Sequence, residues 1–335
     1  MIDIGIIGAS GYTGLELIKI LINHPEFNIK YLATSKGGEE LSKLHPSLKN
    51  VFDISISKAD VSKIPSSCKL VFLALPHKTA AAYAKELLKR GIKVVDLSAD
   101  YRLELDAYEK HYCEHEDKKN LSSAVYGLPE LNREKITQAN LIANPGCYPT
   151  VSLLCILPFI DFIDFDAPII IDAKSGVSGA GKTPNEGVHF VAVNDNIKSY
   201  APLTHRHAPE IEEKISIASG KSSKVVFVPH LLPMTRGMLS SCYVSLKEEI
   251  NEKEVLEKFY KNAEFVRIYD EPVNIKTSVG TNFCDIYTKR DGKTLFISGS
   301  IDNLLRGASS QAVVNANLMC ELDENTGIPS ISYAP

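Results

Sequence analysis

Short apolar runs alternate with longer amphipathic segments over roughly the first 145 residues of the chain. The runs are three to five residues long and rich in Val, Ile and Leu, which is typical of strands in a mostly parallel sheet. They lie at residues 4–7, 29–33, 70–74, 93–96 and 141–143. Residues 14–23 and 80–90 carry apolar side chains at helical spacing between them. This alternation predicts an α/β domain with a doubly wound sheet.

The pattern changes after about residue 165, where the apolar runs lengthen and helical segments become less regular. The runs at 168–172, 224–229, 239–246 and 294–302 predict an α+β domain whose sheet is antiparallel in part. A segment at 307–322, rich in Ala, Val and Leu, predicts a helix that packs back on the first domain. We therefore predict one domain over 1–147, completed by the C-terminal helix in 307–335, and a second over 148–306.

Composition and charge narrow the class of protein. Hydrophobic residues make up 44% and charged residues 23% of the 335 residues, which fits an ordinary soluble protein of two domains. The 37 Lys and Arg against 41 Asp and Glu leave a net charge of −4, so we expect no nucleic acid or membrane as partner and a small molecule instead. Seven scattered cysteines without a CxxC pair, and no leader segment, predict free thiols in the cytoplasm.

A glycine-rich turn follows the first predicted strand and opens the first predicted helix. Its spacing is GxxGxxG rather than GxGxxG, but glycines still allow the backbone to approach a pyrophosphate, and a helix N-terminus attracts one. The candidate cofactor-binding residues are Gly8, Ser10, Gly11, Tyr12, Thr13 and Gly14. The second strand then leads to Ser35 and Lys36, where an NAD-binding protein usually offers a carboxylate. A hydroxyl and a cation suit a 2′-phosphate, so we predict NADP.

Two segments are candidates for catalysis. Cys147 lies between a predicted strand and an apolar helix, so the helix N-terminus lowers the pKa of its thiol and makes it a candidate nucleophile, unlike Cys155 within the helix. His207 precedes a helix with Pro209 in its first turn, where a neutral imidazole is favoured and accepts or relays a proton. His205 is close enough in sequence to share a metal, but no third ligand has a useful spacing, so we predict no metal site.

Residues 176–183 match the P-loop pattern GxxxxGK[ST] completely. A P-loop must run into a helix that presents its N–H groups to phosphate, yet Pro184, Asn185 and Gly187 follow at once. We therefore interpret the segment as glycine-rich backbone that lines a cofactor or substrate site.

Taken together, these motifs resemble the N-acetyl-γ-glutamyl-phosphate reductase family of arginine biosynthesis, and the resemblance runs nearly end to end. It rests on GASGYTG (8–14), LALPH (73–77), DLSADYRL (96–103), YGLPELN (126–132), ANPGCYPT (143–150), SGVSGAGK (175–182), HRHAPEI (205–211), PHLLPMTRGML (229–239) and DNLLRGASSQAVVNANLM (302–319). ANPGCYPT and HRHxPE together are the most specific.

The resemblance implies two domains like those of glyceraldehyde-3-phosphate dehydrogenase, assembled as homodimers or homotetramers. It makes Cys147 the nucleophile and His207 the acid/base, with Glu210 or His205 as support. It also implies two further sets of binding residues. The cofactor would be held by Ser178, Gly179 and Asn303 in addition to the residues of the glycine-rich turn. The substrate would be held by His205, Arg102 and Arg236, although either arginine could form a structural ion pair instead.

The implied reaction is NADPH-dependent reduction of N-acetyl-L-glutamyl 5-phosphate to the 5-semialdehyde through a cysteine thioester. An aminoadipyl phosphate from lysine biosynthesis and an aspartyl phosphate are alternative substrates, because one methylene changes binding by only about 1–3 kcal/mol. Two alternatives of another class are a P-loop nucleotide hydrolase and an NADP-binding sensor without catalysis.

Overall fold

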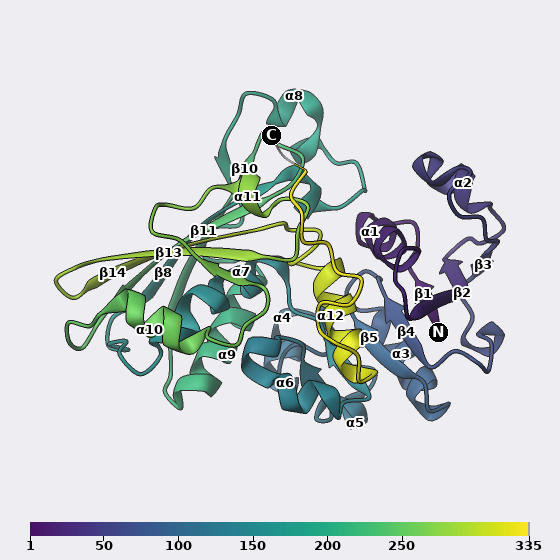
Figure 1. The fold of residues 1–335 in the computed structure, drawn as a ribbon, viewed down its shortest axis with the longest axis horizontal. Helices are drawn as coiled ribbons and strands as arrows, with labels where there is room; N and C mark the ends of the chain where they lie inside the picture. Colours follow the sequence, from purple (N-terminus) through teal and green to yellow (C-terminus); the bar gives the residue numbers. More distant parts are fainter. Residues whose placement is uncertain (334–335) are drawn as a thin grey trace. The chain divides into compact units, whose positions relative to one another are not determined.

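The computed structural model describes residues 1–333 and divides into two compact units. The first consists of Met1–Pro145 and Ala308–Pro329, and the second of Gly146–Gly307 with the chain from Ser330 onward (Figure 1). Cys147 therefore lies at the start of the second unit, one residue after the chain leaves the first.

The first unit is built on a parallel sheet of seven strands in the order β3-β2-β1-β4-β5-β7-β6. The strands are β1 (Ile2–Ile7), β2 (Phe27–Thr34), β3 (Ile56–Lys58), β4 (Leu70–Leu73), β5 (Lys93–Asp96), β6 (Val125–Tyr126) and β7 (Leu141–Ala143). All five predicted strands are present, and the doubly wound α/β class is confirmed. The two strands that were not predicted, β3 and β6, are the edge strands, and they are too short to show a pattern of their own.

Helices cover both faces of this sheet. They are α1 (Tyr12–Leu21), α2 (Leu41–Leu44), α3 (Ala80–Lys89), α4 (Leu105–His111), α5 (Lys118–Leu121), α6 (Pro129–Thr137) and α12 (Ser309–Met319), with 3₁₀ turns η1 (Pro46–Leu48) and η2 (Val61–Lys63). Helix α12 packs against α1 and α6, and every one of its residues is buried. The sequence predicted a longer helix over 307–322, but it ends at Met319 because Glu321 takes a positive φ of 60° that turns the chain. Residues 334 and 335 of the predicted C-terminal segment lie outside the described residues.

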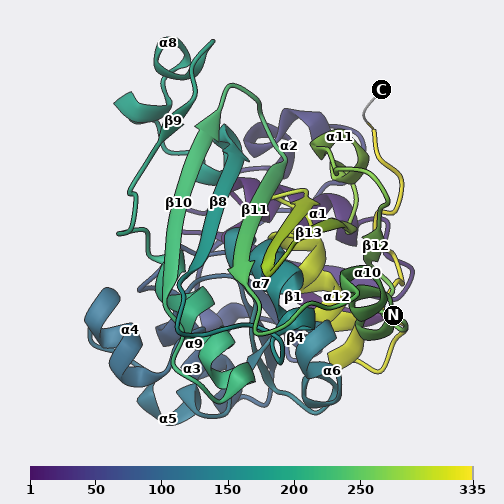
Figure 2. The same ribbon diagram turned by 90° about the vertical axis from the view of Figure 1, so that its left-hand side faces the viewer.

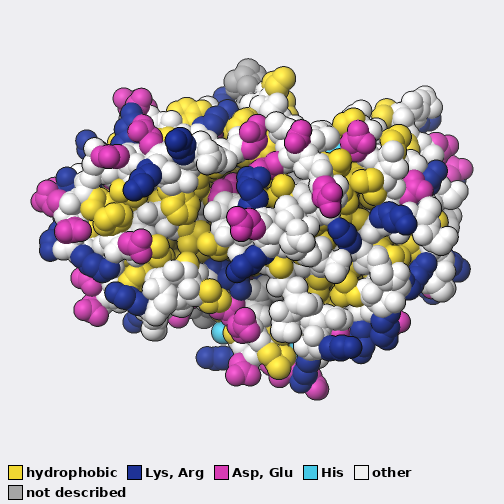
Figure 3. Space-filling model, turned by 60° about the horizontal axis from the view of Figure 1, so that its bottom comes forward, with side chains coloured by type: hydrophobic (Ala, Val, Ile, Leu, Met, Phe, Trp, Pro, Cys, Tyr) yellow, Lys and Arg dark blue, Asp and Glu magenta, His cyan; other side chains and the backbone are white. Residues whose placement is uncertain are grey.

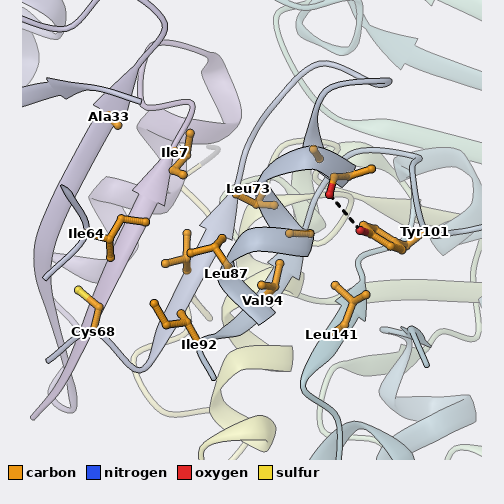
Figure 4. Close-up of a cluster of buried hydrophobic side chains, with 14 of the residues drawn as sticks. Ile7, Ala33, Ile64, Cys68, Leu73, Leu87, Ile92, Val94, Tyr101 and Leu141 are labelled. Atoms are coloured by element: carbon orange, nitrogen blue, oxygen red, sulfur yellow. Dashed lines mark hydrogen bonds between the residues drawn. The ribbon is translucent and has the colours of Figure 1, made fainter. Parts of the chain in front are cut away.

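The core between α3 and the sheet shows how the apolar pattern produces this layer. Ile7, Leu73 and Val94 point from three neighbouring strands toward Leu87 of α3, and all four are fully buried (Figure 4). Burying a side chain of this size contributes about 1.5–3 kcal/mol, so these positions fix which face of each strand turns inward. At the edge of the cluster the hydroxyl of Tyr101 lies 3.4 Å from the carbonyl oxygen of Ala81 and donates to the carboxylate of Asp117 at 2.8 Å.

The second unit has a mixed sheet of seven strands in the order β12-β13-β14-β11-β8-β10-β9. The strands are β8 (Ile169–Gly176), β9 (Lys198–Ser199), β10 (Val225–Leu232), β11 (Met238–Ser245), β12 (Val266–Ile268), β13 (Cys284–Asp291) and β14 (Thr294–Ile301). Strands β8 and β10 are parallel, whereas β11 runs antiparallel to both β8 and β14. The four predicted strands are present as β8, β10, β11 and β14, whereas β9, β12 and β13 were missed. Strands β9 and β12 have only 2 and 3 residues, and the second half of β13, Thr288 to Asp291, is polar.

Two long helices lie on one face of this sheet, as Figure 2 shows. Helix α7 (Cys147–Ile156) packs against β11 and β14, and α9 (His207–Ser219) packs against α7 and β10. The remaining helical elements are α8 (Phe190–Val193), α10 (Glu252–Phe259), α11 (Ile275–Ser278) and the 3₁₀ turns η3 (Leu157–Phe159), η4 (Val177–Ala180) and η5 (Glu186–Val188). The α7–α9 pair brings the two segments with candidate catalytic residues together.

Acidic and basic side chains are mixed over the face drawn in Figure 3, without a large area of either sign. This distribution agrees with the small net charge of −4. Among residues 1–333, none of the helices is both long and apolar enough to cross a bilayer.

Candidate active site

Cys147 is the first residue of α7 and the only residue of that helix that is not buried. Gly146 precedes it in an extended conformation, so the chain enters the helix directly at the cysteine. The first N–H groups of a helix have no partners within the helix, and their positive potential stabilises a thiolate. Each of the seven cysteines, all within the described residues, is a free thiol, and Cys155 of the same helix is fully buried.

Glu210 joins the two helices at the level of the cysteine. Its carboxylate is 1% exposed and accepts a hydrogen bond from the backbone N–H of Gly146 at 3.1 Å. Glu210 lies in the first turn of α9, where the helix N-terminus also stabilises a negative charge. The buried carboxylate thus fixes the peptide that leads into Cys147.

Three aromatic rings surround the start of α7. The ring of Tyr148 lies 5.7 Å from that of His205 and 5.9 Å from that of His207, and the two imidazoles are 4.8 Å apart. The hydroxyl of Tyr148 is 2.9 Å from that of Tyr200. Since Tyr148 follows Cys147 directly, these contacts place both histidines beside the cysteine segment.

His205 is held in its neutral form. Burial, with a smaller contribution from the positive charge of Arg206, lowers the pKa of His205 from 6.5 to about 4. Its Nδ1 accepts a hydrogen bond from the backbone N–H of His207 at 3.1 Å, which requires that nitrogen to be unprotonated. His205 therefore acts as a fixed acceptor that holds the start of α9, two residues before the first residue of that helix.

The P-loop-like segment does not form a P-loop. After β8 the chain enters the 3₁₀ turn η4 and then an exposed stretch, instead of an α-helix. The N–H groups of Gly176, Val177 and Ser178 donate to the carbonyls of Gly237, Met234 and Thr235 at 2.9–3.0 Å. Backbone donors that are already used in this way cannot cradle a phosphate, so the segment carries the letters of the motif without its geometry.

Ser178 instead belongs to a hydrogen-bonded group with Asn303. The Asn303 amide donates to the Ser178 hydroxyl at 3.0 Å, and its oxygen accepts from the N–H of Gly237 at 2.7 Å. A Cβ on Gly179 would lie 3.8 Å from the Asn303 amide nitrogen, and one on Gly307 would lie 2.7 Å from the Cβ of Cys147. The segment 303–307 thus connects the glycine-rich loop to the cysteine.

Arg236 forms a buried ion pair in the same region. Its guanidinium contacts the fully buried carboxylate of Asp302, with distances of 3.0 Å from Nε and from Nη2. The same carboxylate accepts from the N–H groups of Gly280, Leu304 and Leu305. Asp302 therefore organises both Arg236 and the turn that carries Asn303. The sequence left an ion pair open for Arg236, and this ion pair exists.

In the glycine-rich turn of the first unit, Gly8 and Gly14 are closely packed against backbone, whereas Gly11 faces open space. Gly8 has a φ of 101° and packs so closely that a Cβ would lie 2.1 Å from the carbonyl oxygen of Ala74, and a Cβ on Gly14 would lie 2.4 Å from that of Gly8. Above Gly11, which precedes α1, the nearest atoms to such a Cβ are 3.9 Å away. The turn is tightly packed on one side and open at the helix N-terminus, as a phosphate cradle requires.

The remaining predicted residues of the first unit fall in two environments. Ser35 and Lys36 are exposed and follow β2 directly, at the carboxyl end of the strand. Arg102 is buried and donates to the carbonyls of Asn144 and Leu97 at 2.7 and 2.8 Å. Its guanidinium is used to hold the chain just before Cys147, and its proposed contact with substrate stays a prediction.

Sequence reasoning missed Tyr148, Tyr200 and Asp302. Tyr148 could have been noticed as the neighbour of the cysteine, but its hydroxyl partner lies 52 residues away. Asp302 stands in the recognised DNLLRG segment, yet its five-fold hydrogen bonding depends on strands that pair only in the folded chain. Among residues 1–333, no three His, Cys, Asp or Glu side chains converge to hold a metal.

Comparison with known proteins matches each unit to a family model. Residues 3–139 match the semialdehyde dehydrogenase NAD binding domain, and residues 147–303 match the semialdehyde dehydrogenase dimerisation domain. The N-acetyl-gamma-glutamyl-phosphate reductase of Sulfurovum sp. is 59% identical over all of both chains. That of Campylobacter curvus is 56% identical over 99% of this chain and 98% of its own.

Solved structures agree on the fold. Aspartate semialdehyde dehydrogenase II from Vibrio cholerae superimposes with a TM-score of 0.74 at 16% identity, over 96% of this chain and 98% of its own. Aspartate semialdehyde dehydrogenase from Candida albicans, solved with NADP, gives 0.70 at 15% identity, over 95% and 98%. The two-domain α/β architecture is therefore shared with aspartate semialdehyde dehydrogenases.

Proposed function

The chain belongs to the N-acetyl-gamma-glutamyl-phosphate reductase family, and on this premise we propose that it reduces N-acetyl-L-glutamyl 5-phosphate to N-acetyl-L-glutamate 5-semialdehyde with NADPH, in arginine biosynthesis. The observation that carries the proposal is the start of α7. Cys147 is the one accessible residue of an otherwise buried helix, and Glu210, His205 and His207 contact the residues directly before and after it.

Cys147 is the nucleophile of this reaction. Its thiolate attacks the acyl carbon of the substrate, a carbon–sulfur bond forms, the bond from carbon to the phosphate oxygen breaks, and phosphate leaves with that electron pair. The product is a thioester on Cys147. A thioester is a better hydride acceptor than a carboxylate because sulfur donates weakly into the carbonyl.

His207 holds and moves the proton of the site. It takes the proton of the Cys147 thiol as the thiolate forms, and returns it to the cysteine sulfur when the reduced thiohemiacetal collapses and the semialdehyde leaves. Neutral His205 accepts a hydrogen bond from the backbone N–H of His207 at 3.1 Å and so holds His207 in place. The N–H groups at the start of α7 stabilise the negative charge that develops on the acyl oxygen. Glu210 keeps the peptide of Gly146 in place for this purpose.

The residues present fit NADPH. The open space above Gly11 at the N-terminus of α1 suits a pyrophosphate, with Ser10, Tyr12 and Thr13 beside it. Exposed Ser35 and Lys36 suit the 2′-phosphate, and Ser178, Gly179 and Asn303 are proposed to contact the nicotinamide end. NADPH, when bound, supplies the hydride that reduces the thioester.

From the family models we infer the oligomeric state of the protein and the role of each unit. The unit around 1–147, completed by α12, binds the cofactor, and the unit around 148–306 carries the chemistry and the dimer contacts. The protein works in the cytoplasm as a homodimer or homotetramer. Arg102, Arg236 and His205 remain the proposed groups for the substrate carboxylate and phosphate.

The decisive experiment runs the reaction in its easier direction. Phosphate-dependent reduction of NADP⁺ by N-acetylglutamate 5-semialdehyde is measured beside aspartate semialdehyde and the N-acetylated aminoadipate semialdehyde. We expect a clear preference for the first substrate. Cys147→Ser should lower turnover by at least about a thousandfold and leave NADPH binding unchanged, whereas Cys155→Ala, a buried cysteine in the same helix, should retain turnover at a reduced stability.

Three other outcomes would contradict the proposed substrate, the proposed mechanism or the activity itself. A preference for either of the other semialdehydes would change the substrate and leave the chemistry intact. Full turnover in Cys147→Ser would exclude the thioester mechanism. Binding of NADPH without turnover of any semialdehyde would favour a sensor.

A further inference from the structure

The phosphate-binding turn of the first unit is held by a residue from a distant segment. His45 lies between α2 and η1, 36 residues beyond Ala9, and its Nε2 is 2.7 Å from the carbonyl oxygen of Ala9. A carbonyl oxygen only accepts, so Nε2 carries the hydrogen and donates it. Both residues are buried, His45 at 6% and Ala9 at 0% exposure, so water does not compete for this hydrogen bond.

Ala9 is fixed on both sides. Its N–H donates to the carbonyl of Ala33 at the end of β2, as does the N–H of Gly8, at 3.1 and 2.9 Å. Its carbonyl is held by His45. A trans peptide is planar with its C=O and N–H in opposite directions, so fixing the carbonyl of Ala9 also fixes the direction of the Ser10 N–H, away from His45.

The backbone of His45 is itself held in place by two hydrogen bonds. Its backbone N–H donates to the carbonyl of Leu41 at 2.8 Å, and its carbonyl accepts from the N–H of Leu48 at 2.9 Å. Leu41 and Leu48 are buried at 0% and 4% exposure on either side of it, although most of the segment 35–55 is exposed. The segment is anchored at these positions, and from there the imidazole of His45 donates its hydrogen bond to the glycine-rich turn at 8–14.

We propose that His45 is a positioning residue for the cofactor: it orients the peptide between Ala9 and Ser10 so that the Ser10 N–H faces the pyrophosphate of NADPH. This inference rests on the proposed function only in taking the turn at 8–14 as the pyrophosphate site. A preorganised donor strengthens binding because the peptide does not have to be reoriented when the ligand arrives. The side chain of His45 touches the turn and not the reacting atoms.

The test compares two variants that differ only in the donor. H45Q places an amide N–H at a similar reach, and H45M has the same length without a donor. The dissociation constant of NADPH, measured by fluorescence titration without substrate, should rise about five- to tenfold in H45M and less than twofold in H45Q. At saturating NADP⁺ and phosphate, kcat and the KM of the semialdehyde should stay within twofold of the wild type in both.

Two controls separate positioning from a merely structural role. H24M removes another buried imidazole of the same unit, whose Nε2 is 3.0 Å from Asn317 Oδ1 beyond the far end of α1, and should lower Tm without changing NADPH binding. The inhibition constant of 2′-AMP, which has the 2′-phosphate but no pyrophosphate, should be unchanged in H45M. If H45M does not fold, H45F, which keeps a ring and lacks the donor, replaces it.

Each outcome is decisive. Equal NADPH dissociation constants for H45M, H45Q and the wild type would overturn the proposal, as would an equal loss of 2′-AMP and NADPH binding, since His45 would then support the whole segment 35–55. A wild type that does not bind NADPH at all would overturn the proposed function itself.

Discussion

The chain carries two glycine-rich turns with a phosphate-binding pattern, one at 8–14 in the first unit and one at 176–183 in the second. Both follow a strand, and by its letters the second is the better match to its motif. Only the first runs into an α-helix, which begins at Tyr12. The second continues as the 3₁₀ turn η4, and the N–H groups of Gly176, Val177 and Ser178 already donate to carbonyls of the segment 234–237.

The difference shows that a phosphate site requires backbone N–H groups that are not already donating to other groups of the protein. In the first turn the N–H groups of Gly8 and Ala9 donate to the carbonyl of Ala33, but the turn then opens α1, whose leading N–H groups have no partner within the helix. In the second they are used to join β8 to the segment before β11, which frees the side chains of Ser178 and Asn303 for other contacts. Glycine in the first turn makes room for a ligand, whereas in the second it lets two backbone segments approach.

The largest expected effect concerns Gly8. Gly8→Ala combines a positive φ of 101° with a Cβ that would lie 2.1 Å from a backbone oxygen, so we expect a loss of roughly 3–5 kcal/mol in the free energy of unfolding and no NADPH binding. Gly181→Ala has a φ of 84° but no atom within 4 Å, and should cost only about 1–2 kcal/mol. Urea unfolding of both variants measures the difference. Equal losses would show that the two turns are equally constrained.

The next effect concerns the 2′-phosphate. Lys36→Glu replaces an exposed cation after β2 by an anion, and should weaken NADPH binding about 10- to 100-fold and NADH binding less than threefold. Lys43→Glu makes the same change in charge at an exposed position of α2 and serves as the control. Titration of both cofactors into the three proteins checks this. Parallel losses for NADPH and NADH would remove the reason to assign NADP specificity to Lys36.

The third effect is the pH dependence of stability that is due to His205, which lies at the end of the segment after the second turn. His205 has its pKa lowered to about 4 in the folded chain, whereas an unfolded imidazole titrates near 6.5. Between these values the unfolded state binds more protons, so the free energy of unfolding falls as the pH drops from 6.5 to 4. His205→Asn keeps an acceptor for the His207 N–H but cannot be protonated in this range. It should reduce that loss by roughly 2 kcal/mol.

Denaturant unfolding of wild type and His205→Asn at pH 7, 5.5 and 4.5 measures this difference. Carboxylates titrate in the same range in both proteins, so only the difference between their slopes reports on His205. Identical slopes would mean that the pKa of His205 does not differ between the folded and the unfolded chain.

The smallest effect is expected for the lysine of the P-loop-like segment. Lys182 is exposed, and the N–H groups of the loop before it are used within the protein. Lys182→Met should therefore change reductase turnover less than threefold, and calorimetry should detect no binding of Mg²⁺-ATP by wild type or variant. ATP binding that disappears in the variant would restore the nucleotide hydrolase.

The sequence by itself determined the elements whose side chains are buried or whose motif is local. The apolar runs of β1, β2, β4, β5 and β7 predicted the parallel sheet, because a strand covered on both faces must be apolar throughout. The order of strand, cysteine and apolar helix predicted a candidate nucleophile at the N-terminus of α7, because a helix N-terminus depends only on neighbouring residues. The polar half of β13, and the short strands β3 and β6, left no such pattern.

Only the tertiary structure decided which polar groups meet. The carboxylate of Glu210 reaches the N–H of Gly146 across 64 residues, and Asp302 reaches Arg236 across 66. A hydrogen bond of this kind is set by the packing of α7 on α9, or of β14 beside β11, and no local spacing records it. The same holds for the second glycine-rich turn: its letters are those of a P-loop, but the N–H groups of Gly176, Val177 and Ser178 donate to the segment 234–237, and this pairing exists only in the folded chain.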